Sequence, residues 1–371
     1  MMKSPVNPEL SKSEREQMIH QIDTLAKQYQ KENGRKPVIM EVCGSHTVAL
    51  AQTGLKTRLD HAIRFISGPG CPVCVTDQSA IDQMISLVDQ PGVILTTFGD
   101  MMRVPGSYAT LMEKKQRGAD IRIFYSPTEA VTIAENNPGQ TVILLGIGFE
   151  TTIPAILAAV REAEEKSVKN LQVYLSLKRI EPILSTLLND PDLVVDGFIL
   201  PGHVAMIVGE RHFNFLNNRS IPGVISGFTL DEMLTSLKQY LDMLTAGTPG
   251  VINNYQAVVT AEGNPVARQW ISEMLTPVKE AWRGLGEIPE SGYAFTDRFS
   301  HFRVSSDLLT QTPHRVKKTG CRCGDVLTGK IQPLECALFD RICTPDNPVG
   351  PCMVSHEGSC SAAYEMKETI V

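Results

Sequence analysis

The chain has 371 residues, more than one small hydrophobic core accommodates, and this length indicates two or three domains. Its net charge of −6 argues against nucleic-acid binding, because phosphate contacts need a basic surface. No apolar run is long enough for a membrane span, and the polar residues 1–10 lack the apolar core of a signal peptide. We therefore expect a cytoplasmic protein that binds neither nucleic acid nor membranes.

Residues 11–31 are expected to form an amphipathic helix. Ser13 and Glu16 have the spacing of a capping box, and apolar residues then recur at helical intervals. The apolar stripe consists of Met18, Ile22, Leu25, Ala26 and Tyr29. Such a stripe is typical of a helix that packs on a core.

From about residue 36, short apolar runs alternate with helix-like stretches. The runs are apolar on both faces, as in parallel strands covered by helices, and their alternation favours βαβ units. Eight candidate strands span residues 38–42, 63–67, 93–97, 121–125, 142–147, 173–177, 198–200 and 224–226. We predict an α/β fold with two similar doubly wound parallel-sheet domains, at residues 36–125 and 126–232.

Helical periodicity returns at residues 231–244 and 267–281, before a tail rich in proline, glycine and cysteine. The tail has too few apolar residues to pack alone, so a bound metal would have to stabilise it. The odd total of nine cysteines, without a secretion signal, fits metal or redox chemistry better than a disulfide framework.

Four tail cysteines, spaced as Cys336-x6-Cys343-x8-Cys352-x7-Cys360, can converge from loops onto one [4Fe–4S] cluster. Structural zinc is the alternative, although zinc sites usually pair their cysteines at a closer spacing. Cys321 and Cys323 lie just upstream and could replace a ligand, form a redox couple or pack beside the cluster. We place them beside the cluster.

Two further motifs follow strands in the first half of the chain. Gly68-Pro-Gly-Cys71-Pro-Val-Cys74 has the placement of a redox dithiol, in which a helix N-terminus favours the thiolate. The alternative is a pair of buried, unreactive cysteines. Cys43-Gly-Ser-His46 offers one soft and one borderline ligand for iron. The same two residues could instead form a thiolate–imidazole pair for nucleophilic catalysis, or His46 could simply be hydrogen-bonded in a turn.

Four segments lie at the carboxyl ends of candidate strands. In open α/β sheets ligands bind beyond the carboxyl ends of the strands, often in a crevice between domains. The segments are residues 41–47, 65–71, 146–152 and 198–203, and the last brings His203 to the expected cleft. Gly99, Asp100 and Arg103 also follow a strand, where a surface turn with a salt bridge is favoured over an anion site.

These motifs resemble the HypD family of hydrogenase maturation proteins. The resemblance rests on Cys43-Gly-Ser-His46-Thr, the Cys71/Cys74 motif, Leu200-Pro-Gly-His203 and the tail from Glu335 to Cys360, and it runs from the first strand to the end of the chain. It implies two similar α/β domains plus a third, mainly helical and irregular iron–sulfur domain, which would combine residues 1–35 with residues 233–371. It also implies a [4Fe–4S] cluster on Cys336, Cys343, Cys352 and Cys360, and central metal or redox residues Cys43, Cys71, Cys74 and His46.

The resemblance further implies partners and a cargo. Proteins of this family form, with the small protein HypC, a scaffold for the Fe(CN)2CO unit of nickel–iron hydrogenases. Cyanide comes from HypE, which is charged through HypF, and the finished unit passes to the hydrogenase large subunit. The chain alone is expected to be a monomer.

As a hypothesis, Fe(II) carrying CN and CO ligands is held transiently by Cys43, His46 and a cysteine of the partner, while Cys71 and Cys74 cycle between dithiol and disulfide. An iron–sulfur-dependent thiol/disulfide oxidoreductase is the main alternative, and a zinc-stabilised binding module is a third.

Overall fold

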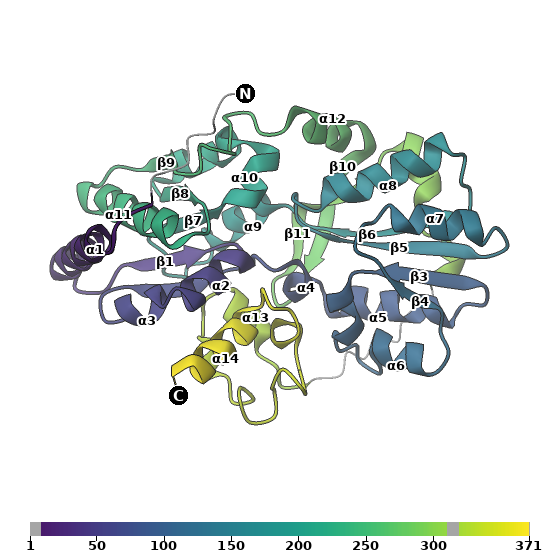
Figure 1. The fold of residues 1–371 in the computed structure, drawn as a ribbon, viewed down its shortest axis with the longest axis horizontal. Helices are drawn as coiled ribbons and strands as arrows, with labels where there is room; N and C mark the ends of the chain where they lie inside the picture. Colours follow the sequence, from purple (N-terminus) through teal and green to yellow (C-terminus); the bar gives the residue numbers. More distant parts are fainter. Residues whose placement is uncertain (1–8, 310–318, 371) are drawn as a thin grey trace.

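The computed structural model describes residues 9–309 and 319–370. Figure 1 shows two sheets side by side, with the cysteine-rich region, residues 319–370, below them. Among the described residues, no helix has both the length and the apolar character needed to cross a membrane. The fold confirms the predicted class, an α/β protein with two parallel sheets and a more irregular C-terminal region.

The first sheet has five parallel strands in the order β2-β1-β7-β8-β9. They are β1 (Val38–Glu41), β2 (Arg64–Ser67), β7 (Gly197–Pro201), β8 (Pro222–Ser226) and β9 (Gly250–Asn253). Helices α1 (Lys12–Asn33), α3 (Leu55–Leu59) and α11 (Leu230–Ala246) share a buried core with one face, while α9 (Ile180–Leu187) and α10 (Gly202–Val208) pack toward the other.

The second sheet has four parallel strands in the order β4-β3-β5-β6. They are β3 (Val93–Thr97), β4 (Ile121–Ile123), β5 (Thr141–Gly148) and β6 (Leu171–Leu177). Helices α7 (Glu129–Asn136) and α8 (Ile153–Glu165) share a core with one face, and α5 (Gln78–Ser86) and α6 (Leu111–Gln116) with the other.

The remaining elements connect strands within or between the sheets or belong to the cysteine-rich region. An antiparallel hairpin consists of β10 (Leu275–Trp282) and β11 (Gly286–Phe295). The other helices are α2 (Gly44–Gln52), α4 (Pro72–Val75), α12 (Pro265–Met274), α13 (Cys323–Leu327) and α14 (Ser359–Ile370). The 3-10 turns are η1 (Leu87–Asp89), η2 (Gly99–Arg103), η3 (Glu210–Arg219), η4 (Asp297–Phe302), η5 (Ser306–Leu308), η6 (Pro333–Glu335) and η7 (Pro351–Met353).

All eight predicted strands are present, with ends shifted by a few residues. The sequence analysis missed β9 and the hairpin. It predicted a helix over residues 267–281, but α12 ends at Met274 and β10 follows. Pro277 explains the difference, because proline has no backbone N–H and disfavours helical geometry in the residue before it.

The expected boundary near residue 125 is wrong as a division between the sheets. Strand β1 pairs with β7 as well as β2, with Met40 opposite both Ile66 and Phe198. The second sheet is therefore formed by the residues between β2 and β7. Hydrophobic runs reveal where strands lie but not which strands are neighbours, so the sequence order suggested a simpler division.

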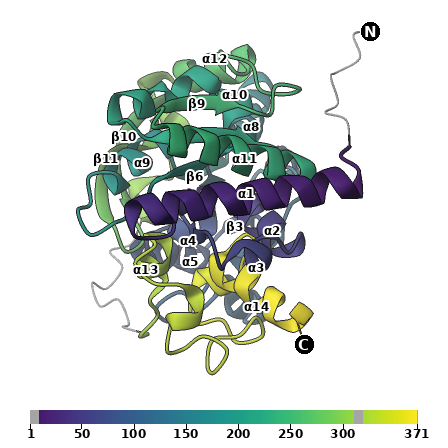
Figure 2. The ribbon, with the colours of Figure 1, turned by 90° about the vertical axis from the view of Figure 1, so that its left-hand side faces the viewer.

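The expected third domain combined residues 1–35 with residues 233–371, but α1 packs on α11 beside the first sheet, while residues 319–370 form a separate cysteine-rich region. Ile22 and Ala26 of α1 are fully buried in one core with Leu237 and Leu241 of α11. Figure 2 shows α1 lying along α11 at the edge of the first sheet. The capping box of α1 is formed by Ser11 and Glu14, not by Ser13 and Glu16.

The packing of α1 predicts a large cost for truncating its buried face. Ile22→Ala should lower the free energy of unfolding by about 2–5 kcal/mol, because it leaves a cavity beneath the first sheet. Urea denaturation measures this difference. The matched control is Gln17→Ala on the exposed face of α1, which should change stability by less than about 0.5 kcal/mol. Equal small effects would show that α1 is not part of this core.

Candidate functional site

The candidate site lies where the two sheets turn their carboxyl ends toward each other. In each sheet the strand order reverses once, between β1 and β7 in the first and between β3 and β5 in the second. Such switch points leave a crevice beyond the strand ends. The segments that follow β1, β2, β5 and β7 meet there in one pocket, as the sequence analysis expected.

We call this the Cys43 pocket; its cavity has a volume of about 220 Å³. The first sheet contributes Cys43, Gly70 and His203, and the second contributes Thr151 and Thr152. Glu357 enters from the cysteine-rich region. Three separate parts of the chain therefore have to be in place before the pocket exists.

Cys43 is fixed by the close approach of two loops. The N–H of Gly44 donates to the carbonyl oxygen of Gly70 at 3.4 Å, and a Cβ on Gly70 would overlap the backbone of Cys43. Burial raises the pKa of the Cys43 thiol to about 11, and the neighbouring Glu357 carboxylate acts in the same direction. The thiol is therefore protonated near neutral pH and must lose its proton when it binds a metal.

His46, the second residue of this motif, does not line the pocket. Its Nε2 lies 3.2 Å and 3.0 Å from the carbonyl oxygens of Ser226 and Gly227, so this nitrogen carries the hydrogen. The ring is fully buried and stacked on Phe228, and burial lowers the pKa of His46 to about 4. The imidazole that faces the pocket is His203, which also stacks on Phe228.

Glu357 is the pocket residue that the sequence analysis missed. The Ser45 hydroxyl donates to its Oε1 at 2.7 Å, and a Cβ on Gly44 would overlap the Glu357 side chain and carbonyl oxygen. The contact joins residues separated by 312 positions. No local spacing signals such a contact, although Glu357 belongs to one of the motifs on which the family resemblance rests.

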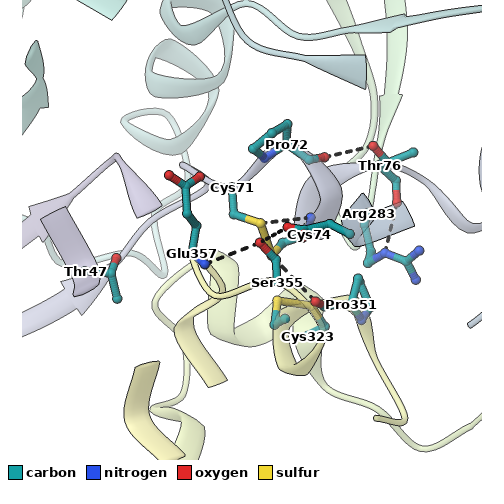
Figure 3. Close-up of a disulfide and its surroundings, with 12 residues drawn as sticks. Thr47, Cys71, Pro72, Cys74, Thr76, Arg283, Cys323, Pro351, Ser355 and Glu357 are labelled. Atoms are coloured by element: carbon teal, nitrogen blue, oxygen red, sulfur yellow. Dashed lines mark hydrogen bonds between the residues drawn. A yellow bond between two sulfur atoms is a disulfide. The ribbon is translucent and has the colours of Figure 1, made fainter. Parts of the chain in front are cut away.

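Cys71 and Cys74 form a disulfide across the first turn of α4, with their Cα atoms 5.3 Å apart. Both residues are buried, and only their neighbours Gly70 and Pro72 line the Cys43 pocket. The carbonyl oxygen of Pro72 accepts a hydrogen bond from the Thr76 hydroxyl at 2.8 Å (Figure 3). The dithiol motif is thus directly behind the pocket wall.

A second disulfide, between Cys323 and Cys352, lies next to the first (Figure 3). Cys74 Sγ is 3.9 Å from the carbonyl oxygen of Pro351, the residue before Cys352. The bond differs from the sequence prediction, which made Cys352 a cluster ligand and placed Cys323 beside the cluster. The first disulfide therefore contacts the residue that precedes Cys352 of the second.

Six cysteines line a second, small cavity of about 20 Å³, which we call the thiol pocket. They are Cys321, Cys323, Cys336, Cys343, Cys352 and Cys360. The four predicted ligands therefore do converge, but Cys352 is bonded to Cys323 while Cys321 has a free thiol. Four free thiols in an apolar pocket form a donor set suited to an iron–sulfur cluster.

A separate question is whether three or more side chains converge on one metal ion. Within residues 9–309 and 319–370, no such group of histidine, cysteine or carboxylate side chains is found.

Comparisons with known proteins identify the family of the chain. The model of the family described as "HypD: Hydrogenase formation hypA family" matches residues 15–367. The chain belongs to the HypD family. It is 40% identical over 340 residues to the hydrogenase maturation factor HypD of Rhodobacter capsulatus, with 89% of each chain covered. It is 39% identical over 338 residues to HypD of Escherichia coli, again with 89% of each chain covered.

A relative with another name gives a similar result. The hydrogenase expression/formation protein HupD of Azotobacter chroococcum is 37% identical over 335 residues, with 88% of each chain covered.

In this HypD-family chain the turn at η2 anchors the cysteine-rich region. The Ser355 hydroxyl donates to Asp100 Oδ2 at 3.1 Å, and the Arg103 guanidinium donates to the carbonyl oxygen of Pro345. The expected surface turn is therefore a contact between the second sheet and the cysteine-rich region.

A buried carboxyl group lies beside the Cys43 pocket. Glu150 is 1% exposed, and its Oε1 accepts a hydrogen bond from the Ile180 N–H at 2.9 Å. Among the described residues its Oε2 has no hydrogen-bond partner. Burial raises the pKa of Glu150 to about 7, from an ordinary value of 4.5.

This raised pKa predicts a pH-dependent stability. Between pH 4.5 and pH 7 the unfolded chain has released the proton of Glu150 that the folded chain still holds. Stability therefore falls as the pH rises across this window, by about 3 kcal/mol from this residue. Glu150→Gln should remove that fall in urea titrations at several pH values, whereas Glu32→Gln, at an exposed position, should preserve it. An unchanged pH profile in Glu150→Gln would contradict the assignment.

Proposed function

We propose that this chain is a hydrogenase maturation factor that holds the iron of the Fe(CN)2CO unit while its ligands are added. The observation that carries the proposal is the position of Cys43, a thiol in an open pocket at the switch points of two sheets. The names of the relatives, hydrogenase maturation or formation proteins, support the same role.

Cys43 is the proposed anchor of the ferrous iron. A soft thiolate suits iron that also carries cyanide and carbon monoxide, because these ligands need electron density on the metal. His203 and Glu357 line the same pocket and are available to contact the ligands. His46 is proposed to position the loop at Ser226 and Gly227 rather than to bind iron, since its Nε2 is already engaged there.

Partner proteins complete the proposed site. HypC would contribute a cysteine to the iron, HypE would deliver cyanide, and the hydrogenase large subunit would receive the product. The free thiols favour a reducing compartment, the cytoplasm.

The four free thiols of the thiol pocket are proposed as ligands of a [4Fe–4S] cluster: Cys321, Cys336, Cys343 and Cys360. When bound, the cluster would supply low-potential electrons for thiol chemistry. The set differs from the sequence prediction in one member, because Cys352 is bonded to Cys323. Burial raises the pKa of both Cys321 and Cys360, so the apolar pocket favours their thiols in the absence of a metal.

Cys71 and Cys74 are proposed to act as the redox pair nearest the iron. Reduction of their disulfide takes two electrons and two protons and yields two thiols. The contact between Cys74 and Pro351 places the second disulfide beside them. The same contact also favours the alternative function, an iron–sulfur-dependent thiol/disulfide oxidoreductase, which would leave the Cys43 pocket without a role.

Removal of the Cys43 thiol tests the iron anchor. In complex with HypC, purified without oxygen, Cys43→Ala should lose the iron that exceeds the cluster, while acid-labile sulfide stays unchanged. His46→Gln should keep that iron, because glutamine can still donate to the two carbonyl groups. Iron retained by Cys43→Ala would refute the assignment, and iron lost from His46→Gln would return the histidine to the ligand set.

Two serine variants distinguish the proposed cluster ligands from the predicted ones. Cys321→Ser should lose most of the cluster iron and sulfide, because it removes one of four ligands. Cys352→Ser should retain both, since it breaks only the bond to Cys323. Iron and sulfide assays on the anaerobically purified chains measure this. Loss in Cys352→Ser with retention in Cys321→Ser would favour the set predicted from spacing.

A further inference from the structure

Residues 355–357, which follow Cys352 closely, contact both sheets. The Ser355 hydroxyl donates to Asp100 of the second sheet's η2 turn, and Glu357 accepts from Ser45 of α2, which follows β1 in the first sheet. The two contacts reinforce each other, because the Glu357 N–H donates to Ser355 Oγ at 3.3 Å. We call residues 355–357 the latch.

The latch is coupled closely to Cys352. The N–H of Ser355 donates to the carbonyl oxygen of Pro351 at 3.2 Å, and the N–H of Gly358 donates to that of Ser355 at 2.8 Å. A Cβ on Gly358 would overlap the backbone of Cys352. This segment is therefore folded tightly on itself, and a displacement of Cys352 has to move Glu357.

The latch is coupled equally closely to Cys43. Gly44 has no room for a Cβ because Glu357 lies against it, and Ser45 carries the hydrogen bond to Glu357 Oε1. Both residues lie in the first turn of α2, for which Cys43 is the N-cap residue. A change in the position of Glu357 therefore changes the environment of the Cys43 thiol directly.

The Cys323–Cys352 bond holds the cysteine end of this segment. It joins η7, which contains Cys352, to α13, which begins at Cys323. α13 is itself held at the hairpin, because a Cβ on Gly324 would overlap the backbone of Gly284. When the bond is intact, the latch is thus tied covalently to a fixed part of the fold.

We propose that the latch makes the Cys43 pocket respond to the redox state of the Cys323–Cys352 pair. A dithiol reductant supplies two electrons and two protons, is itself oxidised to a disulfide, and converts the bond into two thiols. Cys352 is then released from α13, Glu357 moves away from Gly44 and Ser45, and the Cys43 thiol becomes more accessible. Glu357 and Ser355 are positioning residues in this account. The biological use of the device rests on the proposed role of Cys43, but the device itself does not require iron.

The test follows alkylation of Cys43 by iodoacetamide in the full-length chain, resolved by mass spectrometry of the peptide that contains it. Opening the second pair with Cys323→Ser/Cys352→Ser should accelerate the reaction about fivefold, the change expected from loss of one hydrogen-bonded contact. The control, Ser79→Ala, removes a serine hydroxyl hydrogen bond outside both the latch and the Cys43 pocket and should change the rate less than about twofold. Equal rates in all three proteins would refute the proposal.

Variants of the latch make the test independent of the cysteine substitutions. Ser45→Ala leaves both disulfides intact and should accelerate alkylation of Cys43 to a similar extent. When it is combined with Cys323→Ser/Cys352→Ser, the rate should not rise further. Glu357→Gln retains an acceptor for Ser45 and should restore most of the protection lost in Glu357→Ala. Additive effects of Ser45→Ala and the double cysteine variant would overturn the coupling, because independent perturbations add and coupled ones do not.

The outcome is separable from the proposed function. Alkylation of Cys43 is measured without iron or HypC, so a redox-dependent rate would stand even if Cys43→Ala retained iron. A redox-independent rate would remove the latch and leave the iron anchor untouched.

Discussion

The parallel pairing of β1 with β2 is the interaction on which the whole site depends. Its register places Glu41 opposite Ser67, so the two loops that follow leave the sheet side by side. The Ser67 hydroxyl donates to Glu41 Oε1 at 2.6 Å inside the core, and the Gly68 N–H donates to the Glu41 carbonyl oxygen at 2.7 Å. Because Gly70 then lies against the backbone of Cys43, the Cys43 motif and the Cys71/Cys74 motif cannot be positioned independently.

The hairpin provides the corresponding constraint for the two disulfides. Arg283, at its turn, donates through Nε to the carbonyl oxygen of Thr76 and through Nη1 to the Gln78 side chain. Its neighbour Gly284 lies against Gly324, next to Cys323. One turn therefore holds the strand-end loop of the first pair and the helix of the second, which explains how cysteines about 250 residues apart in the chain come together.

Local pattern predicted the elements well but their pairing poorly. The run at residues 142–147 indicates a buried strand because it is apolar on both faces, and it is one. Met40 pairs with Phe198, although all the strands of the second sheet lie between them in the sequence. Hydrophobic periodicity does not encode such a long-range pairing. The same limit applies to cysteines, since spacing identifies a cluster of thiols but not their connectivity. The sequence therefore suggested Cys352 as a cluster ligand with Cys321 beside the cluster, whereas Cys352 is bonded to Cys323 and Cys321 has a free thiol.

The roles of the two histidines show the remaining limit. His46 and His203 both follow strands, and both were candidates for the cleft. Only packing around Phe228 decides that His46 donates to carbonyl oxygens while His203 faces the pocket. The place of Glu357 in the pocket depends on the packing of the cysteine-rich region against α2, which the sequence does not reveal. Residue types at strand ends thus locate the site, and tertiary contacts decide which side chains occupy it.

The most direct test of the account is the infrared spectrum of the chain purified without oxygen in complex with HypC. Cyanide and carbon monoxide bound to iron give stretching bands in a region free of protein absorption. A scaffold for the Fe(CN)2CO unit should show both kinds of band in the wild type and neither in Cys43→Ala. A wild-type complex that has the cluster but shows no such bands would contradict the account and favour the oxidoreductase instead.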